Sequence, residues 1–265
     1  MSLSKINPKN TEAWKMLIEK KEEIAGIQII DLFDSSKNRI EKFSIEFDKM
    51  FLDFSKNIID DETFELLLNL CEDCELKKNI KSLFNGEKIN ETENRSVLHT
   101  ALRDFNLNSE IGKELLLDRQ KIEKFTNDIL SGKTRGSTNK KITDIVNVGI
   151  GGSDLGPNMV VESLKFYKTD LNCHFVSNVD GDHLQEVLKL VDPETTVFII
   201  VSKTFTTQET LTNAKKIKEF LVSRSIEDIS RHFIGVTSNI KSAVEFGLDK
   251  NNIFKMYDFV GGRFS

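Results

Sequence analysis

The sequence predicts an α/β fold, a doubly wound parallel sheet of five strands preceded by a helical N-terminal region. Five short runs rich in β-branched and aromatic residues occur after residue 141, and amphipathic stretches of helical length separate them. Strands that alternate with helices form βαβ units with right-handed crossovers, which place the strands in one parallel sheet. The runs are apolar nearly throughout, as expected where helices cover both faces of a sheet.

The predicted strands are "ITDIVNVG", "CHFVSN", "TTVFIIVS", "HFIGVTS" and, more weakly, "NIFKMYDF". The chain up to about residue 135 instead favours helices. In "TEAWKMLIEKKEEI", for example, apolar residues recur at helical spacing after Thr11, which suits a helix start. The segment "TRGSTNKK" is the best linker candidate, so we expect a helical region over residues 1–135 and an α/β domain over residues 136–265.

Composition and charge narrow the class of protein. The 265 residues carry a net charge of −5, which argues against nucleic-acid or acidic-membrane binding, since both need a basic face. No apolar run approaches the roughly 20 residues that span a bilayer, and the N-terminus does not resemble a secretory signal. Three cysteines are an odd, sparse set that fits a reducing compartment, and "CEDC" is best explained as two thiols on one helix. We expect a cytoplasmic protein.

Polar residues follow each predicted strand. The strand-end segments read "GIGGSD", "SNVDGD", "SKTFTT", "TSN" and "GGRFS". In an open parallel sheet such loops emerge along the carboxyl edge, where ligands bind. The predicted fold therefore places these polar segments together in a cleft at the carboxyl edge of the sheet.

The loop "SKTFTT" has the character of a phosphate site. It runs from a strand end into a helix N-terminus, which exposes unpaired N–H groups and the positive end of the helix dipole. Ser202, Thr204 and Thr207 can each donate a hydroxyl hydrogen, and Lys203 can add charge. The loop is not a Walker motif, which argues against ATP or GTP.

A purely structural explanation of this loop is a capping box formed by Thr206 and Glu209. It accounts for those two residues and leaves the other hydroxyls and the lysine unexplained. Phosphate binding is therefore the favoured interpretation.

The loop "NVGIGGSDLG" allows three interpretations. Gly149 and Gly151 suggest a dinucleotide fingerprint, but its third glycine would fall at Asp154, where close helix packing disfavours a side chain. A tight turn without a ligand is the second interpretation. The third, which we favour, is close approach of a small polar ligand to the backbone at Gly152 and Ser153.

The last loop, "VGGRFS", would direct the planar cation of Arg263 into the cleft. That cation could bind a phosphate or stabilise negative charge that develops elsewhere on a substrate. We assign catalysis to none of the four histidines, which are His99, His174, His183 and His232.

Together these loops resemble the phosphoglucose isomerase (glucose-6-phosphate isomerase) family. The matching stretches are "ENRSVLHTALR", "NVGIGGSDLGP", "HFVSNVDG", "DPETTVFIIVSKTFTTQET" and "VGGRFS", which follow the family's order from about residue 93. The resemblance implies a sugar-isomerase fold of flavodoxin-like type and reversible conversion of glucose 6-phosphate to fructose 6-phosphate, in glycolysis and gluconeogenesis. It also implies a cis-enediolate intermediate, no metal or organic cofactor and, usually, a homodimer.

The resemblance also assigns residues. It implies that Arg263 stabilises the enediolate and that no residue binds a metal. The implied substrate-binding residues are Gly152, Ser153, Ser202, Lys203, Thr204, Phe205, Thr206 and Thr207.

Members of this family are roughly twice as long as this chain. The family's proton-shuttling glutamate, and the histidine and lysine of ring opening, lie in the half that has no counterpart here. We therefore expect an α/β domain truncated at its C-terminal end and no meaningful isomerase activity from these 265 residues alone. A non-catalytic phosphosugar-binding module, as in sensors, is the alternative function.

Overall fold

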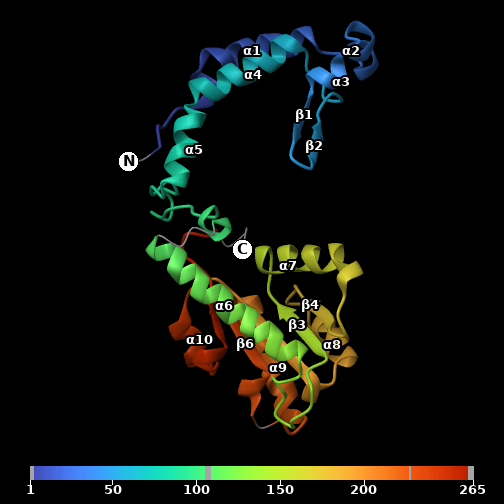
Figure 1. The fold of residues 1–265 in the computed structure, drawn as a ribbon, viewed down its shortest axis with the longest axis vertical. Coiled ribbons are helices and arrows are strands. Elements are labelled where there is room, and N and C mark those ends of the chain that lie inside the picture. The colour runs from blue at the N-terminus through green and yellow to red at the C-terminus, as the bar shows by residue number, and fades with distance from the viewer. Residues whose placement is uncertain (1–2, 105–108, 227, 262–265) are drawn as a thin grey trace. The chain divides into compact units, whose positions relative to one another are not determined.

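The computed structural model describes residues 3–104, 109–226 and 228–261 (Figure 1). The chain divides into two compact units, Met1–Ser96 and Val97–Ser265. Among the described residues, no helix has both the length and the apolar character needed to cross a membrane.

The first unit is built mainly of helices. Its largest pair, α1 (Glu12–Glu23) and α4 (Asp61–Asp73), pack along each other. Thr11 caps α1 by accepting the Trp14 N–H at 3.2 Å, as its position before the helical pattern predicted. The other helices of this unit are η1 (Pro8–Asn10), α2 (Ile29–Ser35), α3 (Arg39–Lys42) and α5 (Leu76–Phe84).

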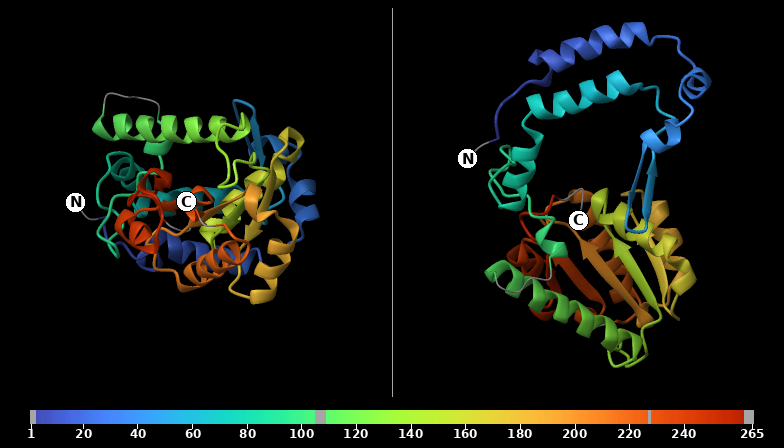
Figure 2. Two further views of the ribbon diagram at one scale, coloured as in Figure 1. Left: turned by 90° about the horizontal axis from the view of Figure 1, so that it is seen from below. Right: turned by 45° about the horizontal axis from the view of Figure 1, so that its top comes forward.

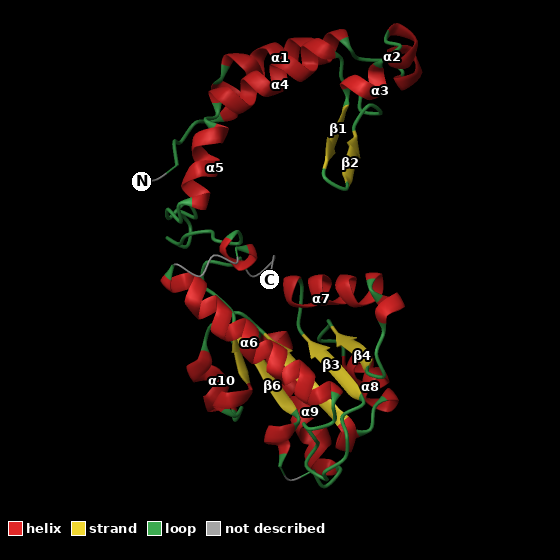
Figure 3. Ribbon diagram, viewed as in Figure 1, coloured by secondary structure: helices red, strands yellow, loops and turns green. Residues whose placement is uncertain are grey.

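A two-stranded hairpin in this unit was not predicted. Strands β1 (Ser44–Phe47) and β2 (Met50–Asp53) pair antiparallel, with Asp48 at a φ of 52° in the turn (Figure 3). The pattern was missed because the strands show no burial alternation: nearly every side chain is exposed within the unit, and Phe47 keeps 71% of its surface accessible.

A buried arginine fixes the chain that follows this hairpin. The Arg39 guanidinium donates to the carbonyl oxygens of Ser55 at 2.8 Å and of Asn57 and Ile59 at 2.9 Å each. It also lies 4.6 Å from the centre of the Phe43 ring, a cation–π distance. Carbonyl oxygens and a ring face thus replace the water that the cation loses on burial.

The second unit contains the predicted sheet. All of its strands are parallel, and their order is β4-β3-β5-β6-β7, the flavodoxin-type order of doubly wound folds. The predicted fold class is confirmed. Four of the strands fall within a predicted run, and β4 begins one residue before the run "CHFVSN". The strands are β3 (Asp144–Val148), β4 (Asn172–Val176), β5 (Thr196–Val201), β6 (Phe233–Thr237) and β7 (Ile253–Lys255).

Helices cover both faces of this sheet (Figure 2). Helices α8 (Gly181–Leu190), α9 (Gln208–Ser223) and α10 (Ile240–Phe246) bury one face, and α6 (Glu110–Leu130) packs on the other. Successive residues of the central strand β5 alternate between the two cores. Phe198 and Ile200 belong to the first core, and Val197 and Ile199 belong to the second.

The segment "TRGSTNKK", our linker candidate, is a turn held against the amino edge of the sheet. Gly136 N–H donates to Lys140 O at 3.0 Å, and Ser137 N–H donates to His232 Nε2 at 3.0 Å. Because Nε2 accepts, the buried imidazole carries its proton on Nδ1 and donates it to Thr196 O at 2.8 Å. The domain boundary near residue 135 stays a prediction, and α6, which precedes it, packs on the sheet of the second unit.

The close packing of this turn gives a test. A Cβ on Gly136 would lie 2.1 Å from Glu194 O and 2.9 Å from His232 Cε1, so Gly136→Ala must displace backbone. We expect it to lower the free energy of unfolding by about 1–3 kcal/mol. Urea unfolding followed by circular dichroism measures this. Gly181→Ala is the control, because a Cβ there meets nothing within 4 Å; an equal loss in both variants would contradict the packing explanation.

Candidate functional site

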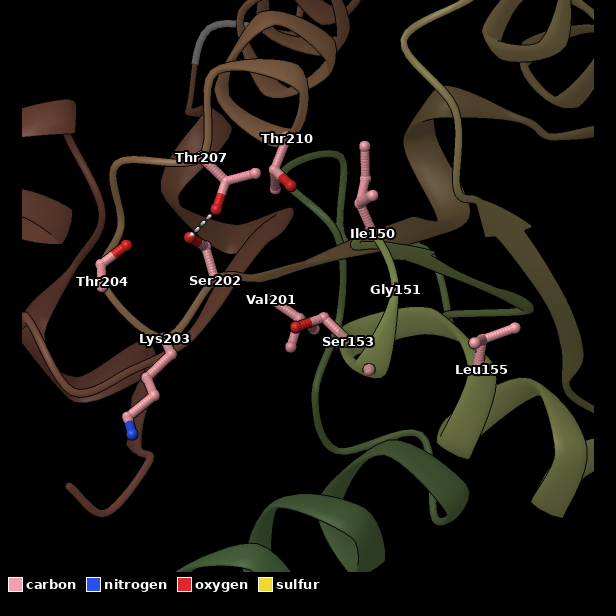
Figure 4. A pocket seen from close by; sticks show the side chains of 11 residues that line it. Ile150, Gly151, Ser153, Leu155, Val201, Ser202, Lys203, Thr204, Thr207 and Thr210 are labelled. Carbon is pink, nitrogen blue, oxygen red and sulfur yellow. Dashed lines mark hydrogen bonds between the residues drawn. The ribbon is translucent and has the colours of Figure 1, made fainter. Parts of the chain in front are cut away.

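A cavity of about 340 Å³ lies where the loops after β3 and β5 meet, at the point where the strand order reverses direction. This switch point is where open α/β sheets bind their ligands. Six of the eight substrate-binding residues expected from the sequence line the cavity (Figure 4). They are Gly152, Ser153, Ser202, Lys203, Thr204 and Thr207.

Among the described residues, the hydroxyls of the loop after β5 (residues 202–207, the β5 loop) are paired only with one another. Ser202 Oγ donates to Thr207 Oγ1 at 3.2 Å, and the hydroxyls of Thr204 and Thr206 lie 2.6 Å apart. Hydroxyl hydrogens can rotate, so these groups can turn their donors to an entering ligand without moving the backbone. The loop therefore presents several adjustable donors around one small volume.

The start of α9 adds backbone donors to this volume. Thr207 is the N-cap and its side chain makes no capping bond, so the capping box of Thr206 and Glu209 considered above is wrong. The first intrahelical bond runs from Leu211 N–H to Thr207 O at 3.0 Å, which leaves the preceding N–H groups outside the helical ladder. Together with the helix dipole, such an end favours an anion.

The loop after β6 (the β6 loop) donates hydrogen bonds to backbone carbonyl groups of the β5 loop. Lys203 O accepts Ser238 N–H at 2.9 Å and Thr237 Oγ1 at 3.0 Å, and Thr204 O accepts Asn239 Nδ2 at 3.1 Å. A trans peptide points its C=O and the next N–H in opposite directions, so the Thr204 N–H faces away from these partners. The predicted polar segment "TSN" thus supports the β5 loop.

Two expected site residues do not line the cavity. The Phe205 side chain is 3% exposed and packs edge-on against Phe246, with ring centres 5.8 Å apart. Its φ of 53° is unusual for a non-glycine residue, and buried packing holds the backbone in this bend. Thr206 is exposed, and its hydroxyl meets that of Thr204.

The glycine loop after β3 is shaped by close backbone contacts. Gly151 has a φ of 63°, and a Cβ on Gly149 would lie 2.6 Å from Ser153 O. The same carbonyl accepts Asn147 Nδ2 at 3.0 Å, from inside β3. These contacts bring the first turn of α7 (Gly152–Ser163) against the strand end and set Ser153 in the cavity wall.

The two cations expected in the cleft have different outcomes. Lys203 is among the residues that line the cavity, but its ammonium group is directed away from Ser202 and Thr207 (Figure 4). It donates instead to the carbonyl oxygens of Asp258 and Val260. Arg263 lies outside the described residues.

Two buried polar groups were not predicted. Thr210 also lines the cavity, is 1% exposed, and its Oγ1 has no hydrogen-bond partner within the described parts of the chain. Asp154, in the first turn of α7, is 4% exposed with a similarly unpartnered Oδ1. Burial raises the pKa of Asp154, and the charge of nearby His183 partly opposes this. The burial of these two side chains could not be predicted from the sequence, because tertiary packing decides which side of a helix is buried.

No histidine is among the residues that line the cavity. His99 Nε2 accepts Gly261 N–H at 3.0 Å, and His174 Nε2 lies 3.0 Å from Asp144 Oδ1. Across residues 3–104, 109–226 and 228–261, no group of three or more His, Cys, Asp or Glu could hold a metal ion, and the three cysteines are free.

Fold and cavity place the chain among the doubly wound α/β proteins with a ligand cavity at the switch point of the sheet. The family model described as phosphoglucose isomerase matches residues 53–265, so the chain belongs to the phosphoglucose isomerase family. This confirms the resemblance of the motifs.

Relatives agree with this assignment. Glucose-6-phosphate isomerase from Christiangramia forsetii is 51% identical over 270 residues, covering 99% of this chain and 50% of that protein. A crystal structure of a glucose-6-phosphate isomerase from Chlamydia trachomatis matches with a TM-score of 0.80 and 27% identity, over 98% of this chain and 50% of that one. The chain spans about half the length of these relatives.

The unpartnered hydroxyl of Thr210 predicts an unusual stabilising substitution. Thr210→Val keeps the shape and removes the buried hydroxyl, so we expect the free energy of unfolding to rise by about 1 kcal/mol. Thr196→Val is the matched control, because the Thr196 hydroxyl donates to Asp192 O at 2.6 Å and its loss should destabilise. Equal losses in both variants, measured by urea unfolding, would show that the Thr210 hydroxyl is satisfied.

Asp154 predicts a pH dependence. Because burial raises its pKa above the ordinary 3.8, the folded protein binds this proton more tightly than the unfolded chain. The free energy of unfolding should therefore fall as pH rises through the interval between the two pKa values. Asp154→Asn should remove that slope, and the exposed Asp182→Asn should retain it. Unfolding curves across about pH 4 to pH 7 test this, and an unchanged slope in Asp154→Asn would assign it to another group.

Proposed function

We propose that this chain supplies the phosphate-binding loop of an aldose–ketose isomerase that interconverts glucose 6-phosphate and fructose 6-phosphate. The observation that carries the proposal is the convergence of Ser202, Thr204 and Thr207 on the uncapped start of α9, inside a switch-point cavity. Adjustable hydroxyl donors and a helix N-terminus are the groups that recognise a phosphate. Membership of the phosphoglucose isomerase family indicates that the phosphate belongs to a sugar.

The cavity volume supports this class of ligand. At about 340 Å³ it lies at the lower end of the range of roughly 300–1,000 Å³ typical for small-molecule sites. A sugar phosphate is a compact ligand that suits a cavity of this volume, whereas a dinucleotide is much larger. In this proposal the phosphate binds at α9 and the sugar extends toward Gly152 and Ser153.

The chemical step would move a proton between C2 and C1 through a cis-enediolate. Such a step needs a base within hydrogen-bond reach of the C2 proton and a group that stabilises the enediolate. We assign the second role to Arg263, on the family resemblance. Among the described residues that line the cavity there is no carboxylate and no imidazole, so we expect no turnover from these 265 residues alone.

The remaining parts of the proposal rest on the resemblance to the family. As a glucose-6-phosphate isomerase the whole protein would act in glycolysis and gluconeogenesis, in the cytoplasm, as a homodimer and without a cofactor. The lack of a base among the described residues of the cavity lining also favours a second function, a phosphosugar sensor that binds and does not convert its ligand.

Binding tests the site shared by both functions. We expect fructose 6-phosphate to bind the purified protein, and Ser202→Ala or Thr207→Val to weaken binding at least about tenfold, because hydrogen bonds to a charged group contribute about 1.5–3 kcal/mol. Calorimetric titration measures the change. Ser223→Ala is the control, since its hydroxyl donates to Phe220 O at the far end of the same helix.

Unchanged affinity in both cavity variants would contradict the phosphate assignment. A coupled assay of fructose 6-phosphate turnover, on a sample of verified intact mass, separates the two functions. Turnover from a chain of this mass would contradict the expectation that the base lies elsewhere.

A further inference from the structure

The ammonium group of Lys203 joins two loops that are far apart in sequence. Its Nζ donates to Asp258 O at 3.1 Å and to Val260 O at 2.7 Å. Both acceptors lie in the segment 257–261, which follows β7. The backbone of the same lysine belongs to the β5 loop and is fixed there by the bonds from Ser238 and Thr237 to its carbonyl oxygen.

This geometry differs from that of a lysine that binds phosphate. A phosphate-binding ammonium would direct its hydrogens into the cavity, whereas Lys203 directs its side chain away from Ser202 and Thr207 (Figure 4). An ammonium has three hydrogens, and two of them serve the carbonyl oxygens. The charge therefore acts mainly on the backbone of segment 257–261.

The segment is tied on other sides to its own unit. Leu98 N–H donates to Phe259 O at 3.1 Å, Gly261 N–H donates to His99 Nε2 at 3.0 Å, and the Tyr257 hydroxyl donates to Asp118. These bonds run to the stretch before α6 and to α6 itself. The two bonds that Lys203 donates tie the segment to the β5 loop, which forms the cavity.

We propose that Lys203 is a positioning residue, whose ammonium group ties the β5 loop to segment 257–261 and does not itself bind the phosphate. Filling of the cavity and protection of the segment are then coupled, because a ligand bound to the β5 loop suppresses local opening of the loop from which the tether starts. The coupling rests on the proposed function, since it requires phosphate at the β5 loop. The tether itself rests on the observed contacts alone.

The experiment compares the wild type with Lys203→Met, Lys203→Arg and Lys241→Met by amide hydrogen exchange, with and without inorganic phosphate. Lys203→Met keeps the apolar stem and removes the donors. Lys241→Met is the matched control, because it removes the same charge from an exposed position on α10 near Glu245.

Without ligand, we expect exchange in segment 257–261 to be about tenfold faster in Lys203→Met, since a lost charged hydrogen bond changes an opening equilibrium by at least that factor. Lys203→Arg should restore most of the protection, and Lys241→Met should match the wild type. Phosphate should slow exchange of the segment in the wild type and not in Lys203→Met. Affinity for phosphate should change less than about threefold, unlike the loss expected for Ser202→Ala.

Unchanged exchange of the segment in Lys203→Met would overturn the tether. A loss of phosphate affinity as large as that of Ser202→Ala would also overturn the proposal, because Lys203 would then be a ligand. If phosphate does not bind the wild type, the proposed function fails, and the exchange rates without ligand still decide whether the tether exists.

Discussion

The cavity depends on the order of the strands. Strands β3 and β5 are neighbours, but the chain leaves β3 toward β4 and leaves β5 toward β6, on opposite sides of the pair. Right-handed crossovers then place α7 and α9 on opposite faces of the sheet, so their first turns separate at the carboxyl edge and leave a space between them. The glycine loop after β3 leads into α7, and the β5 loop leads into α9. The two loops therefore meet in that space.

Rigidity on one side of the β5 loop allows adjustability on the other. The backbone carbonyls of Lys203 and Thr204 are occupied by the β6 loop, and the Phe205 side chain is buried beside Phe246. Within the described parts of the chain, the hydroxyls of the β5 loop have only each other as hydrogen-bond partners. A ligand can therefore be received by rotating hydroxyl hydrogens against a fixed frame, which keeps the entropic cost of binding low.

The strands and their polar ends could be predicted because both signals are local. A strand buried on both faces is an apolar run, and the residue types at its end show directly in the sequence. The hairpin of β1 and β2 could not, since exposed strands lack a burial pattern. The burial of Asp154 and Thr210 and the direction of the Lys203 side chain could not be predicted either. Those depend on which side of a helix meets the sheet and on carbonyl groups more than fifty residues away.

The support of the β5 loop by the β6 loop also has a kinetic consequence. The bonds that shape the site span about 35 residues, from Lys203 to Ser238, so the loop reaches its binding shape only after β6 has joined the sheet. A transition state for folding that forms before that event has no site for the ligand. Added ligand should then slow the unfolding of the second unit and leave its folding rate nearly unchanged. In that case a bound ligand would protect the native protein against unfolding without helping the chain to reach the native state.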